Sequence, residues 1–252
     1  MKNFRNPDFA KAYYIKGDNY FKQGDFNNAI ENFLKGVRLD PEFVDLLIKL
    51  GEAFSKLGRL EEAIDYYTKA IKLEPENHNL YLLRADVYAK KKDFEKEIED
   101  YSNAIRLKPD EPALYGRRAA VFMMLKRYND AIKDYTHLIE LRPTLIWIKV
   151  IRGDAYFEIG KFVEAIKDYD VFIRLHPEYP EPYLKRGKAY ENLGKYESAI
   201  EDFTKTIELA PDMVDAYLLR AQIFKKIKKF KEAEKDIKMA TMISKSKANK
   251  YE

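Results

Sequence analysis

Histidines and adjacent carboxylates are the residues of this chain whose types suit metal binding or acid–base chemistry. His78, His137 and His176 are far apart in the sequence, and none has a second ligand at the spacing of a metal site. Neighbouring acids such as Glu61 and Glu62 recur along the chain, as expected for the solvated face of a helical array. The chain lacks cysteine, a phosphate-cradling glycine loop, a nucleophile elbow and a zinc-binding HExxH helix. The sequence therefore predicts no enzyme, no cofactor and no metal site.

Composition narrows the function classes further. The 252 residues include 46 Lys and Arg and 42 Asp and Glu, which leaves a net charge of only +4. A protein that binds a polyanion usually gathers positive charge on one face, and these totals do not require such a face. The first residues lack the apolar core of a signal peptide, and no run of 18 apolar residues occurs. We expect a soluble, cytoplasmic chain with no membrane contact, unless it was cut from a longer protein.

The elements that position these side chains follow a repeat of 34 residues, marked by prolines at a constant step. If Pro41 is position 32 of a unit, the first unit begins at Ala10. Residues 1–9 are then a polar lead-in, and residues 248–252 a tail. The prolines are Pro41, Pro75, Pro109, Pro143, Pro177 and Pro211. The seven units are 10–43, 44–77, 78–111, 112–145, 146–179, 180–213 and 214–247.

Each unit reads as two amphipathic helices, helix A over about positions 2 to 14 and helix B over about positions 18 to 31. Position 8 is always Gly or Ala, and position 24 is aromatic in six units, so small residues permit close approach beside large rings. Glycine at position 15 of four units marks the end of helix A, where a left-handed residue is common. The last unit has Glu234 and Lys245 in place of an isoleucine and the proline, and we expect it to be a polar cap.

These residues carry a resemblance to the tetratricopeptide repeat family. Its pattern has an aromatic residue, Leu-Gly, Tyr, Ala, Phe, Ala and Pro at positions 4, 7, 8, 11, 20, 24, 27 and 32, and the match covers residues 10 to 247. The resemblance implies an all-α, right-handed superhelical solenoid of about seven helix pairs. It also implies that the A helices line a concave groove that binds a peptide or protein segment.

One departure from the family pattern recurs in units three to seven. Position 7 is Arg where the family often has Leu, position 23 is Asp in the same units, and both are missing from units one and two. Joint presence and joint absence predict an ion pair between helices A and B of one unit, with a structural role. The predicted pairs are Arg84–Asp100, Arg118–Asp134, Arg152–Asp168, Arg186–Asp202 and Arg220–Asp236.

The resemblance implies that positions 2, 5, 9, 12 and 13 face the groove. In units one to three an acid at position 9 precedes a Lys at position 13, and we expect these charges to pair within one helix. The pairs are Asp18–Lys22, Glu52–Lys56 and Asp86–Lys90.

Units four and five break this pattern and supply the candidate binding site. We expect an apolar anchor there, with Asp154 and Glu158 receiving a basic group of the ligand because no Lys lies on their face. The apolar members are Gly116, Ala120, Met123, Met124, Trp147 and Phe157. The alternative is local repacking, since Leu138 and Phe172 replace a small residue at position 27 and should alter the angle between units.

Three other interpretations are open or excluded. The carboxylate clamp that some relatives use for an acidic chaperone tail is not matched, because Tyr14 and Asp18 stand where it needs Lys and Asn. The run KIKKFKEAEKDIK in the last unit is a weak signal for nucleic acid, because acids interrupt it and no aromatic row accompanies it. Self-association through the apolar stretch from Leu145 to Ile148 is a third possibility. The sequence predicts a protein-interaction scaffold without identifying its partner or oligomeric state.

Overall fold

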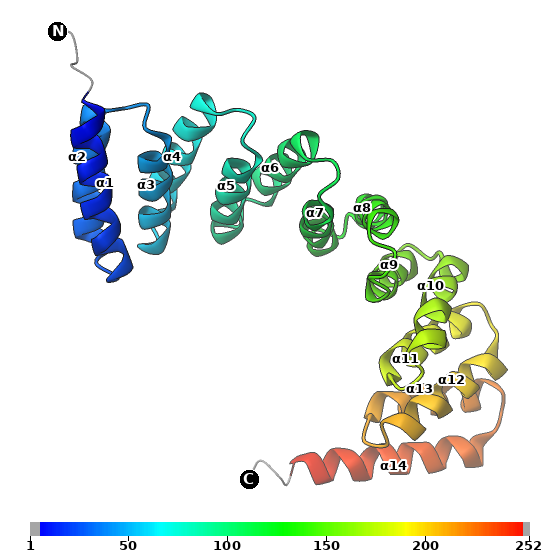
Figure 1. The fold of residues 1–252 in the computed structure, drawn as a ribbon. Coiled ribbons are helices and arrows are strands. Elements are labelled where there is room, and N and C mark those ends of the chain that lie inside the picture. Colours follow the sequence, from blue (N-terminus) through cyan, green and yellow to red (C-terminus); the bar gives the residue numbers. More distant parts are fainter. Residues whose placement is uncertain (1–5, 249–252) are drawn as a thin grey trace. The chain divides into compact units, whose positions relative to one another are not determined.

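The computed structural model describes residues 6–248, and these form fourteen helices joined by short turns (Figure 1). Their bounds are α1 Pro7–Lys22, α2 Phe26–Leu39, α3 Val44–Lys56, α4 Leu60–Leu73, α5 His78–Lys91, α6 Phe94–Leu107, α7 Pro112–Met124, α8 Tyr128–Leu141, α9 Trp147–Glu158, α10 Phe162–Leu175, α11 Pro180–Asn192, α12 Tyr196–Leu209, α13 Val214–Lys226 and α14 Phe230–Ala248. The odd-numbered helices are the A helices of the seven repeats, and the even-numbered helices are the B helices.

The helices group into two compact units, residues 1–121 and 122–252, with the boundary inside α7. In the first unit α1 packs on α2, α3 on α4 and α5 on α6, and each B helix contacts the next A helix, α2 with α3 and α4 with α5. The second unit repeats this scheme from α8 to α14. The all-α solenoid of about seven helix pairs predicted from the sequence is confirmed.

Helix A and helix B of one repeat approach closely because position 8 carries no bulk. A Cβ atom added to Gly187 would lie 2.7 Å from the ring of Phe203, and one added to Gly51 would lie 2.6 Å from the ring of Tyr67. Phe203 and Tyr67 occupy position 24 and are almost fully buried. The ring of helix B therefore fills the space that the small residue of helix A leaves free.

The turn between the two helices of a repeat needs a left-handed residue at position 15. Four repeats have glycine there, with φ between 71° and 80°, which agrees with the sequence-based expectation. The other three have Lys92, Lys126 and Lys228 with φ of 62°, 57° and 61°, so the same turn forms with a residue that pays a steric cost.

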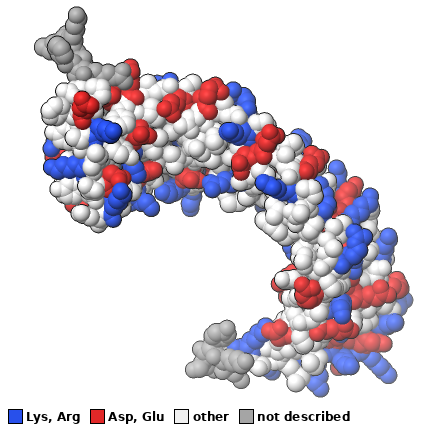
Figure 2. Space-filling view, in the orientation of Figure 1, with Lys and Arg blue, Asp and Glu red and all other residues white. Residues whose placement is uncertain are grey.

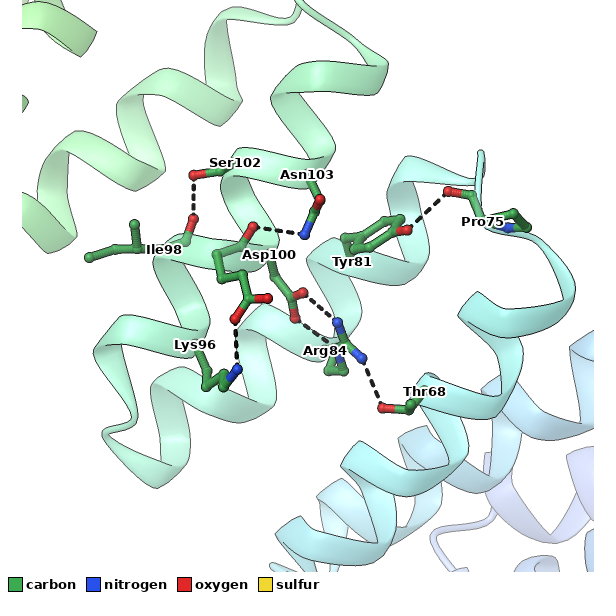
Figure 3. A network of polar contacts seen from close by, with 10 residues as sticks. Thr68, Pro75, Tyr81, Arg84, Lys96, Ile98, Asp100, Ser102 and Asn103 are labelled. Atoms are coloured by element: carbon green, nitrogen blue, oxygen red, sulfur yellow. Dashed lines mark hydrogen bonds and ion pairs between the residues drawn. The ribbon is translucent and has the colours of Figure 1, made fainter.

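A tyrosine–proline contact ties each of four repeats to the proline of the repeat before it. Tyr81 donates its hydroxyl hydrogen to the carbonyl oxygen of Pro75 at 3.0 Å, and this contact is visible in Figure 3. Tyr115, Tyr183 and Tyr217 make the same bond to Pro109, Pro177 and Pro211. The fifth repeat has Lys149 at that position, so its junction lacks the bond.

The ends of the array differ in detail from the expected boundaries. The helix α1 begins at Pro7, three residues before the predicted first repeat, and α14 runs to Ala248. In α14, Glu234 is exposed as expected, but Phe230 and Met242 are exposed as well, so its outer face is only partly polar. Residues 1–5 and 249–252, at the ends of the predicted lead-in and tail, lie outside the described residues. In the part of the chain that the structure describes, every helix is too short or too polar to cross a bilayer.

Candidate functional site

Four of the five arginines at position 7 bind the aspartate of their own repeat in a two-pronged pair. Nε and Nη2 of Arg84 donate to the two carboxylate oxygens of Asp100 at 2.9 and 2.7 Å (Figure 3). Arg152–Asp168, Arg186–Asp202 and Arg220–Asp236 have the same geometry. Arg118 and Asp134 belong to different units, and their pairing stays a prediction.

The structure adds a third partner that the sequence analysis missed. The remaining nitrogen, Nη1, donates to position 25 of the preceding repeat, as Arg84 does to the hydroxyl of Thr68 at 2.8 Å (Figure 3). Four of these acceptors are hydroxyl groups, those of Thr68, Ser102, Thr136 and Thr204. The arginine therefore joins one A helix to two successive B helices. A repeated Ser or Thr at position 25 was the available sequence signal.

The fifth acceptor is a carboxylate, so Arg186 is held by two acids. Its Nη1 donates to Asp170 at 2.6 Å, in addition to the pair with Asp202. Burial disfavours the charged guanidinium, but Asp202 and Asp170 together outweigh this effect and raise the pKa of Arg186. These pairs bury their charge within the array, which suits a structural role and leaves no free group for chemistry.

Only one of the three charge pairs expected within the A helices of the first three repeats forms. Lys22 and Asp18 lie 2.6 Å apart, as expected. Glu52 instead accepts from Lys49 on its own helix, and Asp86 accepts from Arg117 of the next repeat. The expectation was wrong for Glu52–Lys56 because Lys49, one turn before Glu52 on the same helix, takes the place of Lys56. It was wrong for Asp86–Lys90 because Arg117 of the next A helix reaches Asp86.

A pocket of about 510 Å³ in the second unit contains half of the predicted anchor. Met123 and Phe157 supply its apolar lining, and Asp154 and Glu158 lie beside them. Phe157 is held by an edge-to-face contact with Phe162, with ring centres 5.2 Å apart. The remaining lining residues are Lys126, Tyr128, Tyr169, Lys185 and Lys188. We call this the lysine-rimmed pocket.

The expectation that Asp154 receives a basic ligand group is wrong, because its carboxylate is already occupied. Lys185, on the next A helix, pairs with Oδ2 at 2.5 Å, and the hydroxyl of Tyr169 donates to Oδ1 at 2.8 Å. Burial, and then the charge of Asp154, raise the pKa of Tyr169, so this phenol remains a donor. Glu158 accepts from the hydroxyl of Tyr128 at 3.4 Å. Lys185 is 31 residues from Asp154 in the sequence. The sequence analysis considered only residues on the same helix as Asp154 and therefore did not predict this pair.

Trp147 does not belong to the lysine-rimmed pocket. It lines a separate, almost wholly apolar pocket of about 240 Å³, together with Phe172, Tyr179 and Glu181. Phe172 packs against Tyr179 and His176, with ring centres 5.8 and 5.0 Å apart. We call this the aromatic pocket. The single anchor predicted from the sequence is thus two sites at different places in the second unit.

The other predicted anchor residues divide as follows. Met124 is 62 % exposed, while Met123 is only partly exposed. Gly116 and Ala120 fall in the first unit, so their place in an anchor with Trp147 stays a prediction. The case for Gly116 and Ala120 as binding residues rests on the sequence alone.

The two alternative surfaces are less favourable than their sequences suggested. In the stretch from Leu145 to Ile148, Trp147 is exposed, Leu145 and Ile146 are half-buried and Ile148 is buried, so less apolar surface is offered for self-association than the sequence suggests. Part of the positive charge of the last repeat is neutralised by ion pairs, because Lys226 pairs with Glu191 and Lys247 with Asp212. Figure 2 shows acidic and basic side chains interspersed over the visible face of both units.

The histidines lie apart from any cluster of donors. His137 contacts Glu140, and His176 lies near Glu178 at 3.7 Å in the aromatic pocket's surroundings. Among the described residues, no group of three or more His, Asp or Glu side chains is arranged to hold a metal ion. This arrangement gives no support to a metal centre.

Comparison with protein families matches most of the chain to repeat models. The models described as tetratricopeptide repeat match residues 48–112, 153–223 and 214–247, and a model described as TPR repeat matches residues 17–58. No curated protein sequence gives a significant match.

Solved structures supply the fold-level relatives. The MamA protein is 27% identical over 69% of this chain and 96% of its own, with a TM-score of 0.64. The C-terminal part of a TPR repeat-containing protein from Cytophaga hutchinsonii is 18% identical over 91% of this chain and 95% of its own, with a TM-score of 0.72. YrrB, described as a TPR protein with an unusual peptide-binding site, is 21% identical over 73% of this chain and 95% of its own, with a TM-score of 0.61. The last two likenesses concern the fold alone.

Proposed function

Because this chain belongs to the tetratricopeptide repeat family, we propose that it is a non-catalytic scaffold that binds a protein or peptide segment along its A helices. Preorganisation is the physical advantage of such a scaffold, since a rigid array spares the ordering cost on one side of the complex.

The lysine-rimmed pocket is the observation that carries this proposal. It is large enough for one or two side chains, and it combines an apolar floor, Met123 and Phe157, with a few polar groups. Methionine adapts its shape to different partners, which suits a binding floor.

The charges of the pocket favour an acidic group beside the apolar side chain of the ligand. Lys185 neutralises Asp154, whereas no carboxylate among the described residues pairs with Lys126 or Lys188. With Glu158 included, the pocket has three lysines and two carboxylates, so one positive charge is in excess. A segment that presents an apolar residue next to Asp or Glu would satisfy both parts.

A capture experiment with the intact chain tests the proposal. Proteins bound by the wild type are quantified by mass spectrometry and compared with those bound by Met123→Glu and Lys188→Glu. Both changes should remove the same partners, because each places negative charge in a pocket that favours an acidic ligand. Val163→Glu is the matched control, since Val163 is 50 % exposed on α10 and does not line the pocket.

Circular dichroism of each variant checks that the helices are intact. Loss of partners with Val163→Glu as well would point to a general effect of added charge. Capture that is identical in all three variants would place binding elsewhere and contradict the proposed site.

A further inference from the structure

The aromatic pocket combines three rings with one carboxylate at the junction of the fifth and sixth repeats. Trp147 comes from the start of α9, Phe172 from α10 and Tyr179 from the turn before α11, and Glu181 lies in the first turn of α11. Glu181 is the only charged residue in the lining. The volume of about 240 Å³ admits one side chain.

The rings of this pocket lack the cations that cover other rings of the array. Elsewhere, Arg59 lies over Phe54 with 4.5 Å to the ring centre, and Lys69 lies over Tyr66 at 4.6 Å. Within residues 6–248, no Lys or Arg lies over Trp147, Phe172 or Tyr179. Trp147 is 52 % exposed and Tyr179 is 49 % exposed, so their faces are accessible from solvent.

The carboxylate of Glu181 also lacks an ion-pair partner among the described residues. Asp154 and Glu191, acids of the same unit, each pair with a lysine of the following A helix. No basic side chain of the described residues forms an ion pair with Glu181. The pocket therefore combines electron-rich ring faces with one solvent-exposed carboxylate at its edge, and a cation is attracted by both.

We propose that the aromatic pocket receives an arginine or lysine side chain of the segment that the scaffold binds. The aliphatic stem of that side chain packs against the rings while its charged end reaches Glu181. A purely apolar side chain would fill the same volume without the attraction to Glu181, which is exposed to solvent. The inference rests on the proposed scaffold function and adds the chemistry of one ligand residue to it.

Trp147 is the only tryptophan of the chain, and it lies in the pocket, so its fluorescence reports occupancy directly. The experiment titrates the intact protein with capped tripeptides whose central residue is Arg, Lys, Gln or Leu, at constant ionic strength. The excitation wavelength is one that tyrosine does not absorb. The Arg and Lys peptides should give a saturable change in Trp147 emission, whereas the Gln and Leu peptides should not.

Two variants separate a cation site from simple apolar packing. Glu181→Gln should weaken the Arg peptide by about two- to five-fold, and Phe172→Leu should weaken it by about as much, since each contact is partly exposed. Glu164→Gln, which removes the same charge at an exposed position of α10 outside the pocket, should leave the affinity unchanged. Circular dichroism confirms that each variant is folded.

Equal responses to the Arg, Gln and Leu peptides, or no saturable response to Arg at concentrations up to about 100 mM, would overturn the inference. This failure is distinct from failure of the scaffold proposal. If capture of partners depends on Met123 and Lys188 while the Arg peptide fails to bind, the scaffold function stands and the cation site does not.

Discussion

The pair of Arg186 with Asp202 offers the sharpest test of how the repeats are held together. Its two hydrogen bonds, at 2.9 and 2.6 Å, join α11 to α12, and the side chains of Arg186 and Asp202 are 18% and 5% exposed. Removing one member of a buried pair costs about 3–5 kcal/mol, because the other charge is left without a partner. Since Arg186 retains some contact with water, we take the lower end of this range.

A double-mutant cycle on Arg186 and Asp202 measures their coupling, and the second acid, Asp170, should make the two single substitutions differ in cost. Arg186→Met should destabilise the chain by about 3 kcal/mol, because it leaves Asp202 buried without a cation. Asp202→Ala should cost less, about 2 kcal/mol, because Arg186 keeps its 2.6 Å contact with Asp170. The double variant should lose about as much as Arg186→Met alone, which corresponds to a coupling energy of about 2 kcal/mol.

Urea unfolding followed by circular dichroism measures the four free energies of unfolding. Arg220 and Asp236 form the matched control, with bonds of 2.8 Å and a threonine instead of a second acid. There the two single changes should cost more nearly the same amount. Additive effects at Arg186 and Asp202, with no coupling, would refute the reasoning, and equal asymmetry in both cycles would refute the role of Asp170.

Three further predictions concern single positions of the array. Glu97 is 5% exposed with one carboxylate oxygen unpartnered, and burial raises its pKa, so stability should fall as pH rises from the usual carboxyl range through the raised pKa. Glu97→Ala should gain about 1–3 kcal/mol at neutral pH and flatten this dependence in melts over a pH series, whereas the exposed Glu99→Ala should not. Lys92→Gly should raise the free energy of unfolding by about 1 kcal/mol, because Lys92 has a left-handed backbone with φ of 62°. A lower urea midpoint than that of the wild type would contradict the assigned strain. Gly187→Ala should cost about 1–3 kcal/mol by clashing with Phe203, and Phe203→Leu in the same chain should recover part of that loss.

Much of the fold could be predicted from the sequence because its signals are local and repeated. The glycines at position 15 have positive φ, and the Gly187–Phe203 contact shows the close approach expected of the small residue at position 8. The arginine and aspartate of one repeat were found together because they occur together, and their ion pair needs only the contact of adjacent helices. Each of these features depends on one helix or one helix pair.

The candidate site was predicted less well because it depends on contacts between repeats. Sequence spacing shows which residues share a face of one helix, but Asp154 was assigned to a ligand without regard to Lys185 of the next repeat. Trp147 was grouped with Met123 although the two line different pockets.

The sequence by itself determined the repeat length, the helix pairs, the turn residues and the internal Arg–Asp pairs of this protein. Only the tertiary structure decided that Arg186 also reaches Asp170, that Lys185 pairs with Asp154 and that Trp147 lines a separate pocket together with Phe172 and Glu181. The physical reason is the rotation between successive helix pairs, which sets the residues that meet across a junction. Helical periodicity contains no information about that rotation, since side chains packed at each junction determine it.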